Sequence, residues 1–192
     1  IEEEFETEAI AKAIENQNDD KKNQKYIGMS KNRIVDYWQE INDEANEYGT
    51  SVHELIETYI MKNKWYFPKD EKEKKILSEF NKLNLELGRE CYPERVLFSE
   101  EYEIAGTTDL LVDIDDDFFE IGDWKTNKKI NFYSLFKKRL KPPFEHLQDC
   151  EYVVYTLQLS IYALLYEMES KKKCRQIWMA HWDRQKEVWT KV

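Results

Sequence analysis

Residues 106–126 read GTTDLLVDIDDDFFEIGDWKT, and this stretch decides the fold. Two apolar runs, TTDLLVDI and FFEIGDWKT, flank the turn sequence Asp115-Asp116-Asp117, a pattern that predicts a β-hairpin. The preceding run, RVLFSEEYEI from Arg95, has the same strand-like character. Together the three runs predict a three-stranded meander.

Helical patterns surround this meander. Ser30 is a candidate N-cap for a helix through Ile41. Gly49-Thr50-Ser51 is expected to break that helix and to start a second one. Asp70 is expected to cap a third helix, which ends near Gly88. A long helix is expected over 152–168, followed by a terminal hairpin formed by RQIWMAHW and KEVWTKV. The order predicts an α/β fold with a mixed sheet flanked by helices.

The N-terminal region has a different character. Residues 2–17 indicate an acidic helix, and a polar linker follows it. We therefore expect two parts, an N-terminal helix and linker over residues 1–29 and one folded domain over residues 30–192.

Composition limits the function classes. The chain has 192 residues, enough apolar residues for a core, and a formal net charge of −10, so any polyanion site must be a local basic patch. Cys91, Cys150 and Cys174 are odd in number and form no CxxC pair, which indicates neither a disulfide framework nor a metal knuckle. With no apolar run of 18 residues, we expect no membrane insertion and a reducing, intracellular setting.

Three charged residues in the hairpin are candidates for a site. Asp123 and Lys125 are two apart on a strand and so share a face, and a hairpin that turns at 115–117 brings Asp109 beside them. Two neighbouring carboxylates repel each other unless they share a proton or bind a cation, and oxygen ligands suit Mg²⁺ or Mn²⁺. The structural alternative is a surface hairpin with an Asp–Lys ion pair.

Further polar residues have helical or strand spacing that is compatible with a site. His53 and Glu57 share one helical face, as do Gln158 and Tyr162 in QLSIY, and Gly106 precedes Asp109 by three residues. The alternative for His53 is a hydrogen-bonded core histidine, and for Tyr162 a core tyrosine. HELIE is not the HExxH pattern of a zinc protease, because Glu57 stands where the second ligand would be.

The segment from Trp124 to Phe144 is basic and contains no acidic residue. Its aromatic residues either bury against the core or stack on bases, and basic residues interleaved with aromatics suit single-stranded nucleic acid. The basic residues are Lys125, Lys128, Lys129, Lys137, Lys138, Arg139 and Lys141, and the aromatic ones include Phe132, Tyr133, Phe136 and Phe144.

In combination, these motifs resemble the PD-(D/E)XK nuclease superfamily, in its RecB-like and phage-exonuclease-like branch. The matching pieces are GTSVHELIE, GTTD, DWK and QLSIY, which follow one another in the branch's order over roughly residues 49–165. The resemblance implies a restriction-endonuclease-like αβββαβ core. It also allows a phage or viral origin.

The resemblance implies roles for individual residues. Asp109, Asp123 and Lys125 would be catalytic, with a divalent metal held by His53, Asp109, Asp123 and the Trp124 carbonyl. Gln158 and Tyr162 would contact the substrate strand together with Lys128, Lys129, Lys137, Lys138 and Arg139; Glu57 and Thr126 are further candidates. The glutamates at 94, 100, 101 and 103 are open candidates for a further metal ligand. The cysteines do not reproduce the branch's iron–sulfur cluster, so we expect none.

The expected function is that of a metal-dependent exonuclease acting on single strands or ends of DNA. Expected partners are nucleic acid and a helicase or other replication or repair protein. One alternative is a cap-snatching-like RNA endonuclease. Others are a non-catalytic nucleic-acid-binding module of the same fold and a purely structural domain.

Overall fold

The computed structural model describes residues 13, 25–62, 65–85, 90–134 and 136–192. The chain divides into two compact units, Ile1–Tyr48 and Gly49–Val192, and this division falls within a helix. Apart from Ala13, the helix and linker expected before residue 25 lie outside the described residues. In the first unit, Tyr26 packs edge-on against Tyr37 and Trp38, and its hydroxyl accepts a hydrogen bond from Trp38 Nε1.

Helix α2 (Lys31–Met61) begins as expected but does not break at Gly49. Ser30 Oγ accepts a hydrogen bond from the Arg33 backbone N–H at 3.3 Å, as an N-cap does. The predicted break is wrong because Gly49 serves another purpose: a Cβ there would lie 3.0 Å from Thr126 Oγ1. Glycine costs about 1 kcal/mol in a helix interior, and burial of the apolar face that includes Val52 offsets this.

Helix α3 (Glu71–Lys82) has the predicted cap and an earlier end than predicted. Asp70 accepts a hydrogen bond from the Glu73 backbone N–H at 2.8 Å. The helix stops before Gly88 because Asn84 adopts a left-handed conformation with φ of 47°, which terminates the helical hydrogen-bond pattern.

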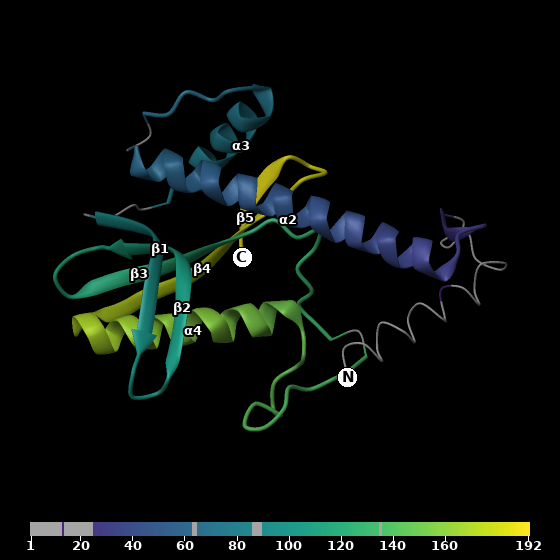
Figure 1. Cartoon of the computed structure of the whole chain (residues 1–192). Helices are drawn as coiled ribbons and strands as arrows, with labels where there is room; N and C mark the ends of the chain where they lie inside the picture. The colour runs from purple at the N-terminus through teal and green to yellow at the C-terminus, as the bar shows by residue number, and fades with distance from the viewer. Residues whose placement is uncertain (1–12, 14–24, 63–64, 86–89, 135) are drawn as a thin grey trace. The chain divides into compact units, whose positions relative to one another are not determined.

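The sheet has five strands in the order β1-β2-β3-β4-β5 (Figure 1). The expected meander and terminal hairpin are confirmed, and among the pairs formed by the described residues the β3–β4 pair is the parallel one. Helix α4 (Glu151–Ser170) makes the long connection that a parallel pair requires. The strands are β1 (Glu90–Ser99), β2 (Ile104–Asp113), β3 (Phe118–Lys125), β4 (Lys173–Asp183) and β5 (Val188–Lys191). The protein is thus an α/β fold with a mixed sheet.

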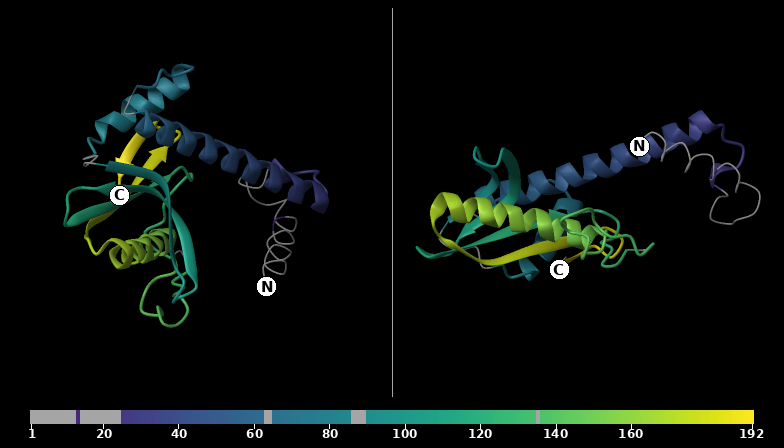
Figure 2. Two further views of the ribbon diagram at one scale, coloured as in Figure 1. Left: turned by 60° about the vertical axis from the view of Figure 1, so that its left-hand side comes forward. Right: turned by 90° about the horizontal axis from the view of Figure 1, so that it is seen from below.

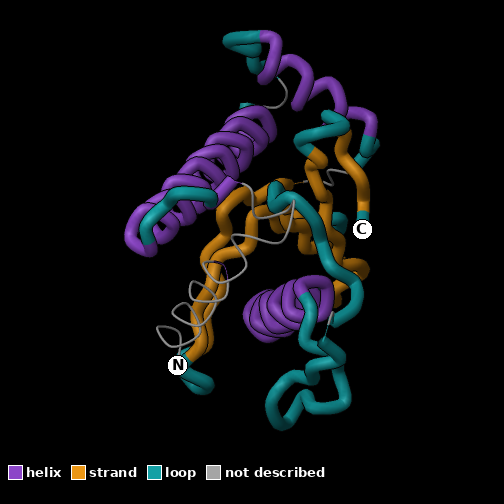
Figure 3. Tube along the Cα trace, turned by 90° about the vertical axis from the view of Figure 1, so that its right-hand side faces the viewer, coloured by secondary structure: helices purple, strands orange, loops and turns teal. Residues whose placement is uncertain are grey.

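The two faces of β3 pack against different helices, as the alternation of its side chains dictates. Phe119 and Ile121 belong to a core cluster with Leu159 of α4, and Figures 2 and 3 show α4 lying along one face of the sheet. Trp124 faces the other way, and its ring lies 5.2 Å from that of Phe80 on α3. The sheet is therefore covered on both faces, which fixes the positions of the strand ends.

No helix among the described residues is both long and apolar enough to cross a membrane. The three cysteines, Cys91, Cys150 and Cys174, are free thiols.

Candidate metal and nuclease site

The site begins where β2 and β3 separate. Their pairing ends with Leu110 opposite Gly122. Beyond this pair, the side chain of Asp109, not the backbone of β2, accepts the next backbone hydrogen bond from β3. Asp109 Oδ2 accepts a hydrogen bond from the Trp124 backbone N–H at 2.7 Å. This bond fixes the Asp109 carboxylate at the end of the hairpin, as the sequence predicted for a residue beside Asp123.

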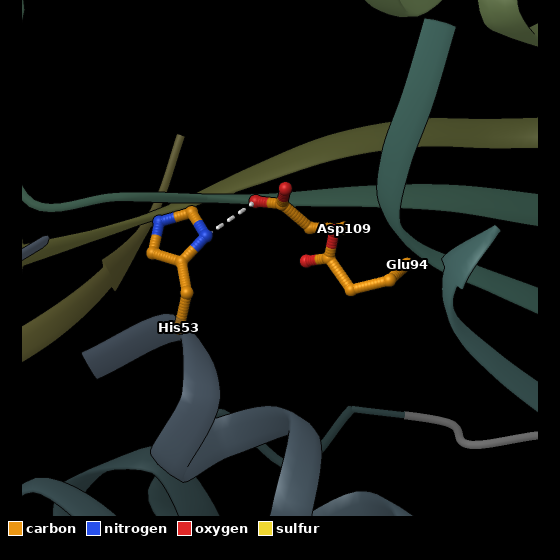
Figure 4. Close-up of side chains that lie close together, drawn as sticks. All are labelled: His53, Glu94 and Asp109. Atoms are coloured by element: carbon orange, nitrogen blue, oxygen red, sulfur yellow. Dashed lines mark ion pairs between the residues drawn. The ribbon is translucent and has the colours of Figure 1, made fainter. Parts of the chain in front are cut away.

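A histidine and two carboxylates converge at this point (Figure 4). His53 Nδ1, from α2, lies 3.4 Å from Asp109 Oδ2. Glu94 comes from β1, where the pairing of Pro93 with Leu110 and of Arg95 with Thr108 sets it opposite Asp109. Ligand atoms of His53, Glu94 and Asp109 all lie within 4.8 Å of one another, and the close-up shows the three side chains directed toward a common centre.

Asp123 and Lys125 form an ion pair beside this cluster. Lys125 Nζ lies 2.8 Å from Asp123 Oδ2, and the two side chains are only 18% and 7% exposed. Asp123 Oδ2 is buried and, this ion pair aside, has no hydrogen-bond partner. The ammonium group also lies 4.2 Å from the centroid of the Tyr155 ring, at cation–π distance, so α4 helps to hold Lys125 in place.

Negative charge is in excess at the site. Burial, and next the charge of Asp109, raises the pKa of Asp123 from 3.8 to about 6. Burial and the charges of Asp109 and Glu57 also raise the pKa of Glu94. Burial lowers the pKa of His53, but its hydrogen bond and attraction to Asp109 outweigh this and raise the pKa overall. These carboxylates therefore favour protons, and a divalent cation can replace a proton at such a site.

The donor set fits Mg²⁺ or Mn²⁺. Carboxylate oxygens are preferred by both ions, and one imidazole is better tolerated by Mn²⁺. Glu94 and Asp109 supply oxygens, His53 supplies a nitrogen, and the unbonded Asp123 Oδ2 lies in the same charged region. No cysteine belongs to this group.

Two of the sequence motifs meet on α4. Gln158 Nε2 donates a hydrogen bond to the Tyr162 hydroxyl at 2.9 Å, so the predicted shared face is confirmed. The Tyr162 ring packs onto Gly106, where a Cβ would lie 2.5 Å from ring atom Cε1. Glycine is therefore required at position 106 because the Tyr162 ring lies close to the backbone of β2.

The remaining predicted residues lie around this centre. Glu57 lies near enough to Glu94 to raise its pKa, and both line an open groove of about 580 Å³ along β1. Thr126 packs beside Gly49, and the Trp124 ring is buried, while metal binding by the Trp124 carbonyl stays a prediction. The basic residues lie exposed in the segment after β3; they are Lys128, Lys129, Lys137, Lys138 and Arg139.

Two residues of the site were not singled out from the sequence. Glu94 was one of four glutamates, and the other three, at 100, 101 and 103, lie in the turn between β1 and β2. A turn over residues 100–103 would itself have indicated that Glu94 is opposite Asp109. Tyr155 was missed, although it precedes Gln158 by three and Tyr162 by seven residues, the spacing of one helical face.

No family model, curated protein or solved structure matches the chain. The functional assignment therefore depends on the geometry of the site and on the motifs.

Proposed function

We propose that this protein is a divalent-metal-dependent nuclease that hydrolyses phosphodiester bonds of DNA, as an exonuclease acting on single strands or on ends. The observation that carries the proposal is the convergence of His53, Glu94 and Asp109 next to the Asp123–Lys125 pair. A structural ion pair needs one acid and one base. This site has three acids, Glu94, Asp109 and Asp123, from three separate strands, beside one histidine and one lysine.

The acidic residues and His53 would hold Mg²⁺ or Mn²⁺. When bound, such an ion polarises the phosphate and lowers the pKa of the attacking water. Asp109 and His53 are already fixed by their contacts with the Trp124 N–H and with each other, so little reorganisation is needed to present their ligand atoms. Glu94 adds an oxygen from the opposite strand.

Lys125 supplies the positive charge of the site. Its ammonium lies between the Asp123 carboxylate and the Tyr155 ring, and a half-buried cation there would stabilise negative charge that grows on the phosphate during hydrolysis. Gln158 and Tyr162, which are hydrogen-bonded to each other on α4, would contact the substrate strand. The exposed basic residues after β3 would bind phosphates along that strand.

The test is a cleavage assay on labelled linear and circular substrates, single-stranded and duplex, in DNA and RNA. We expect digestion of linear DNA with Mn²⁺ or Mg²⁺, none with a chelator, and sparing of circles. Asp123→Asn and Lys125→Ala should each lose nearly all activity while remaining folded, because Asp123 would help to hold the metal and Lys125 would stabilise charge on the reacting phosphate.

The matched control is Asp113→Asn, which removes a carboxylate from the same sheet where it pairs with Lys172 at 2.8 Å. This variant should keep its activity. Cleavage by Asp123→Asn or Lys125→Ala at the wild-type rate would overturn the nuclease assignment. If the protein digested RNA and not DNA, the substrate would be RNA.

A further inference from the structure

The segment between β3 and α4 is a positively charged loop in an acidic protein. We call residues 126–149 the basic loop. The basic loop has six basic side chains and two acidic ones, Glu145 and Asp149, whereas the whole chain has a net charge of −10. A positive segment of this kind attracts a polyanion that the rest of the surface repels.

Hydrogen bonds within the basic loop hold its described residues, which exclude residue 135, in a defined conformation. The backbone N–H of Leu140 donates to the Leu147 carbonyl at 3.2 Å, and that of Asp149 donates to the Lys138 carbonyl at 3.0 Å. Arg139 Nη1 donates to the His146 carbonyl at 2.9 Å, so this guanidinium also stabilises the loop. Because its conformation is already set, the loop would lose little conformational entropy on binding a ligand.

The first residues of the loop are fixed by contacts with β4 and with the start of α4. His181 Nε2 lies 2.7 Å from the Asn127 carbonyl oxygen, and His181 stands opposite Lys125 in the parallel register of β3 and β4. The Asn131 N–H donates to Glu151 Oε2 at 2.6 Å, where α4 begins. Because Asn127 and Asn131 follow Lys125 closely in the sequence, these contacts connect the start of the loop to the proposed site.

Two aromatic rings stand exposed on this ordered loop. Tyr133 is 74% exposed and Phe136 is 80% exposed, whereas the neighbouring Phe132 packs on Tyr152 with 5.0 Å between ring centroids. Large rings exposed beside lysines fit a ligand that carries both negative charge and flat apolar faces. Single-stranded nucleic acid has both, while a duplex keeps its base faces stacked inside.

We propose that the basic loop binds single-stranded nucleic acid, with bases stacked on Tyr133 and Phe136 and phosphates paired with Lys137 and Lys138. The inference deepens the proposed function by naming the form of nucleic acid that reaches the site, and it rests on that function only for the reaction that follows binding.

The experiment measures binding of a fluorescent oligothymidylate of about 20 nucleotides and of a blunt two-stranded duplex of similar length, by anisotropy in chelator so that nothing is cleaved. Tyr133→Ala/Phe136→Ala should weaken oligothymidylate binding by roughly tenfold or more, because each base–aromatic stack contributes about 1–3 kcal/mol. Duplex affinity should stay within about twofold, because a duplex offers no base faces for stacking. Tyr133→Leu/Phe136→Leu, which keeps apolar side chains without flat rings, should weaken oligothymidylate binding as much.

The lysines give a different signature. Lys137→Ala/Lys138→Ala should weaken binding of both probes and lower the log–log salt slope for the single strand by about 0.7 for each phosphate that a lysine no longer neutralises. An unchanged slope would show that these lysines do not face the strand.

The matched control is Phe98→Ala/Tyr102→Ala, which removes one phenylalanine and one tyrosine that are 61% and 56% exposed near the acidic β1–β2 turn. It should bind both probes as wild type does. Equal losses on both probes from the Tyr133/Phe136 variant, or no loss, would overturn the proposal. If the Tyr133/Phe136 variant lost only single-strand binding and the wild-type protein cleaved nothing with Mn²⁺, the binding proposal would be supported and the nuclease assignment would be wrong.

Discussion

Replacement of Asp123 by asparagine should change how stability depends on pH in the metal-free protein. The pKa of Asp123 is raised from 3.8 to about 6, chiefly by burial and then by the charge of Asp109. Between these two pH values the folded protein keeps a proton that the unfolded chain has released. Stability contributed by this group therefore falls as the pH rises from about 4 to about 6, and the loss persists at higher pH.

The size of the effect follows from the same values. Each pKa unit corresponds to 1.36 kcal/mol, so ionisation of Asp123 costs the folded state roughly 3 kcal/mol at neutral pH. The Asp123 side chain is only 7% exposed, so solvent screening reduces this figure little. Asparagine keeps the shape of the side chain and cannot ionise, so it removes this dependence on pH.

The assay is urea unfolding of both proteins in chelator at pH values from about 4 to about 7.5, since urea, unlike guanidinium, leaves the ionic strength unchanged. The free energy of unfolding of Asp123→Asn minus that of wild type should increase by roughly 3 kcal/mol across this range. Any contribution that is independent of pH, such as a changed contact with Lys125, cancels in this comparison.

A difference that stays constant between pH 4 and 7.5 would refute the description of Asp123 as a buried, strained carboxylate. Saturating Mn²⁺ provides a second reading, because a ligand that binds only the folded state stabilises it. Wild type should gain more stability from Mn²⁺ than Asp123→Asn does.

Three further predictions concern the residues around Asp123. His53→Ala should bind Mn²⁺ more weakly and lose activity that a high metal concentration only partly restores. Calorimetric titration with Mn²⁺ and the melting temperature, measured on the same sample, check this. A lower melting temperature with unchanged Mn²⁺ affinity would exclude a ligand role for His53. Tyr155→Leu should lower kcat with little change in KM, while Tyr155→Phe should keep both values, because an aromatic face is needed to hold the Lys125 ammonium, which lies 4.2 Å from the ring centroid. Equal activities of the two variants would count against this contact. Gly122→Ala should destabilise the fold by about 2 kcal/mol or more in urea unfolding, because its Cβ would lie 2.2 Å from the Trp178 ring, and wild-type stability would contradict that packing.

Local signals in the sequence predicted the elements well. Asp70 and Ser30 cap helices because their side chains bond to backbone groups three residues away, which requires no knowledge of the rest of the fold. The meander was similarly predictable from the period-two pattern of its strands and the acidic turn at 115–117. The placement of Asp109 beside Asp123 followed from that hairpin alone.

Contacts between distant segments could not be predicted in this way. Gly49 was interpreted as a helix break because glycine disfavours helix, but the reason for glycine there is Thr126, more than seventy residues away in the sequence. Glu94 joins the site through the register of β1 with β2, and Tyr155 through the packing of α4 on the sheet. Each of these depends on tertiary structure, which overrides local propensity.

Because Tyr162 packs closely against Gly106, the motifs GTTD and QLSIY are expected to evolve together. A chain that acquired alanine at position 106 would clash with the tyrosine ring, and a chain without the tyrosine would leave a void over the glycine. Neither change is easily accepted alone, so the two positions should be exchanged together as a lineage diverges. In relatives too distant to align by ordinary similarity, the pair would then serve as a single signature spanning two elements of the fold.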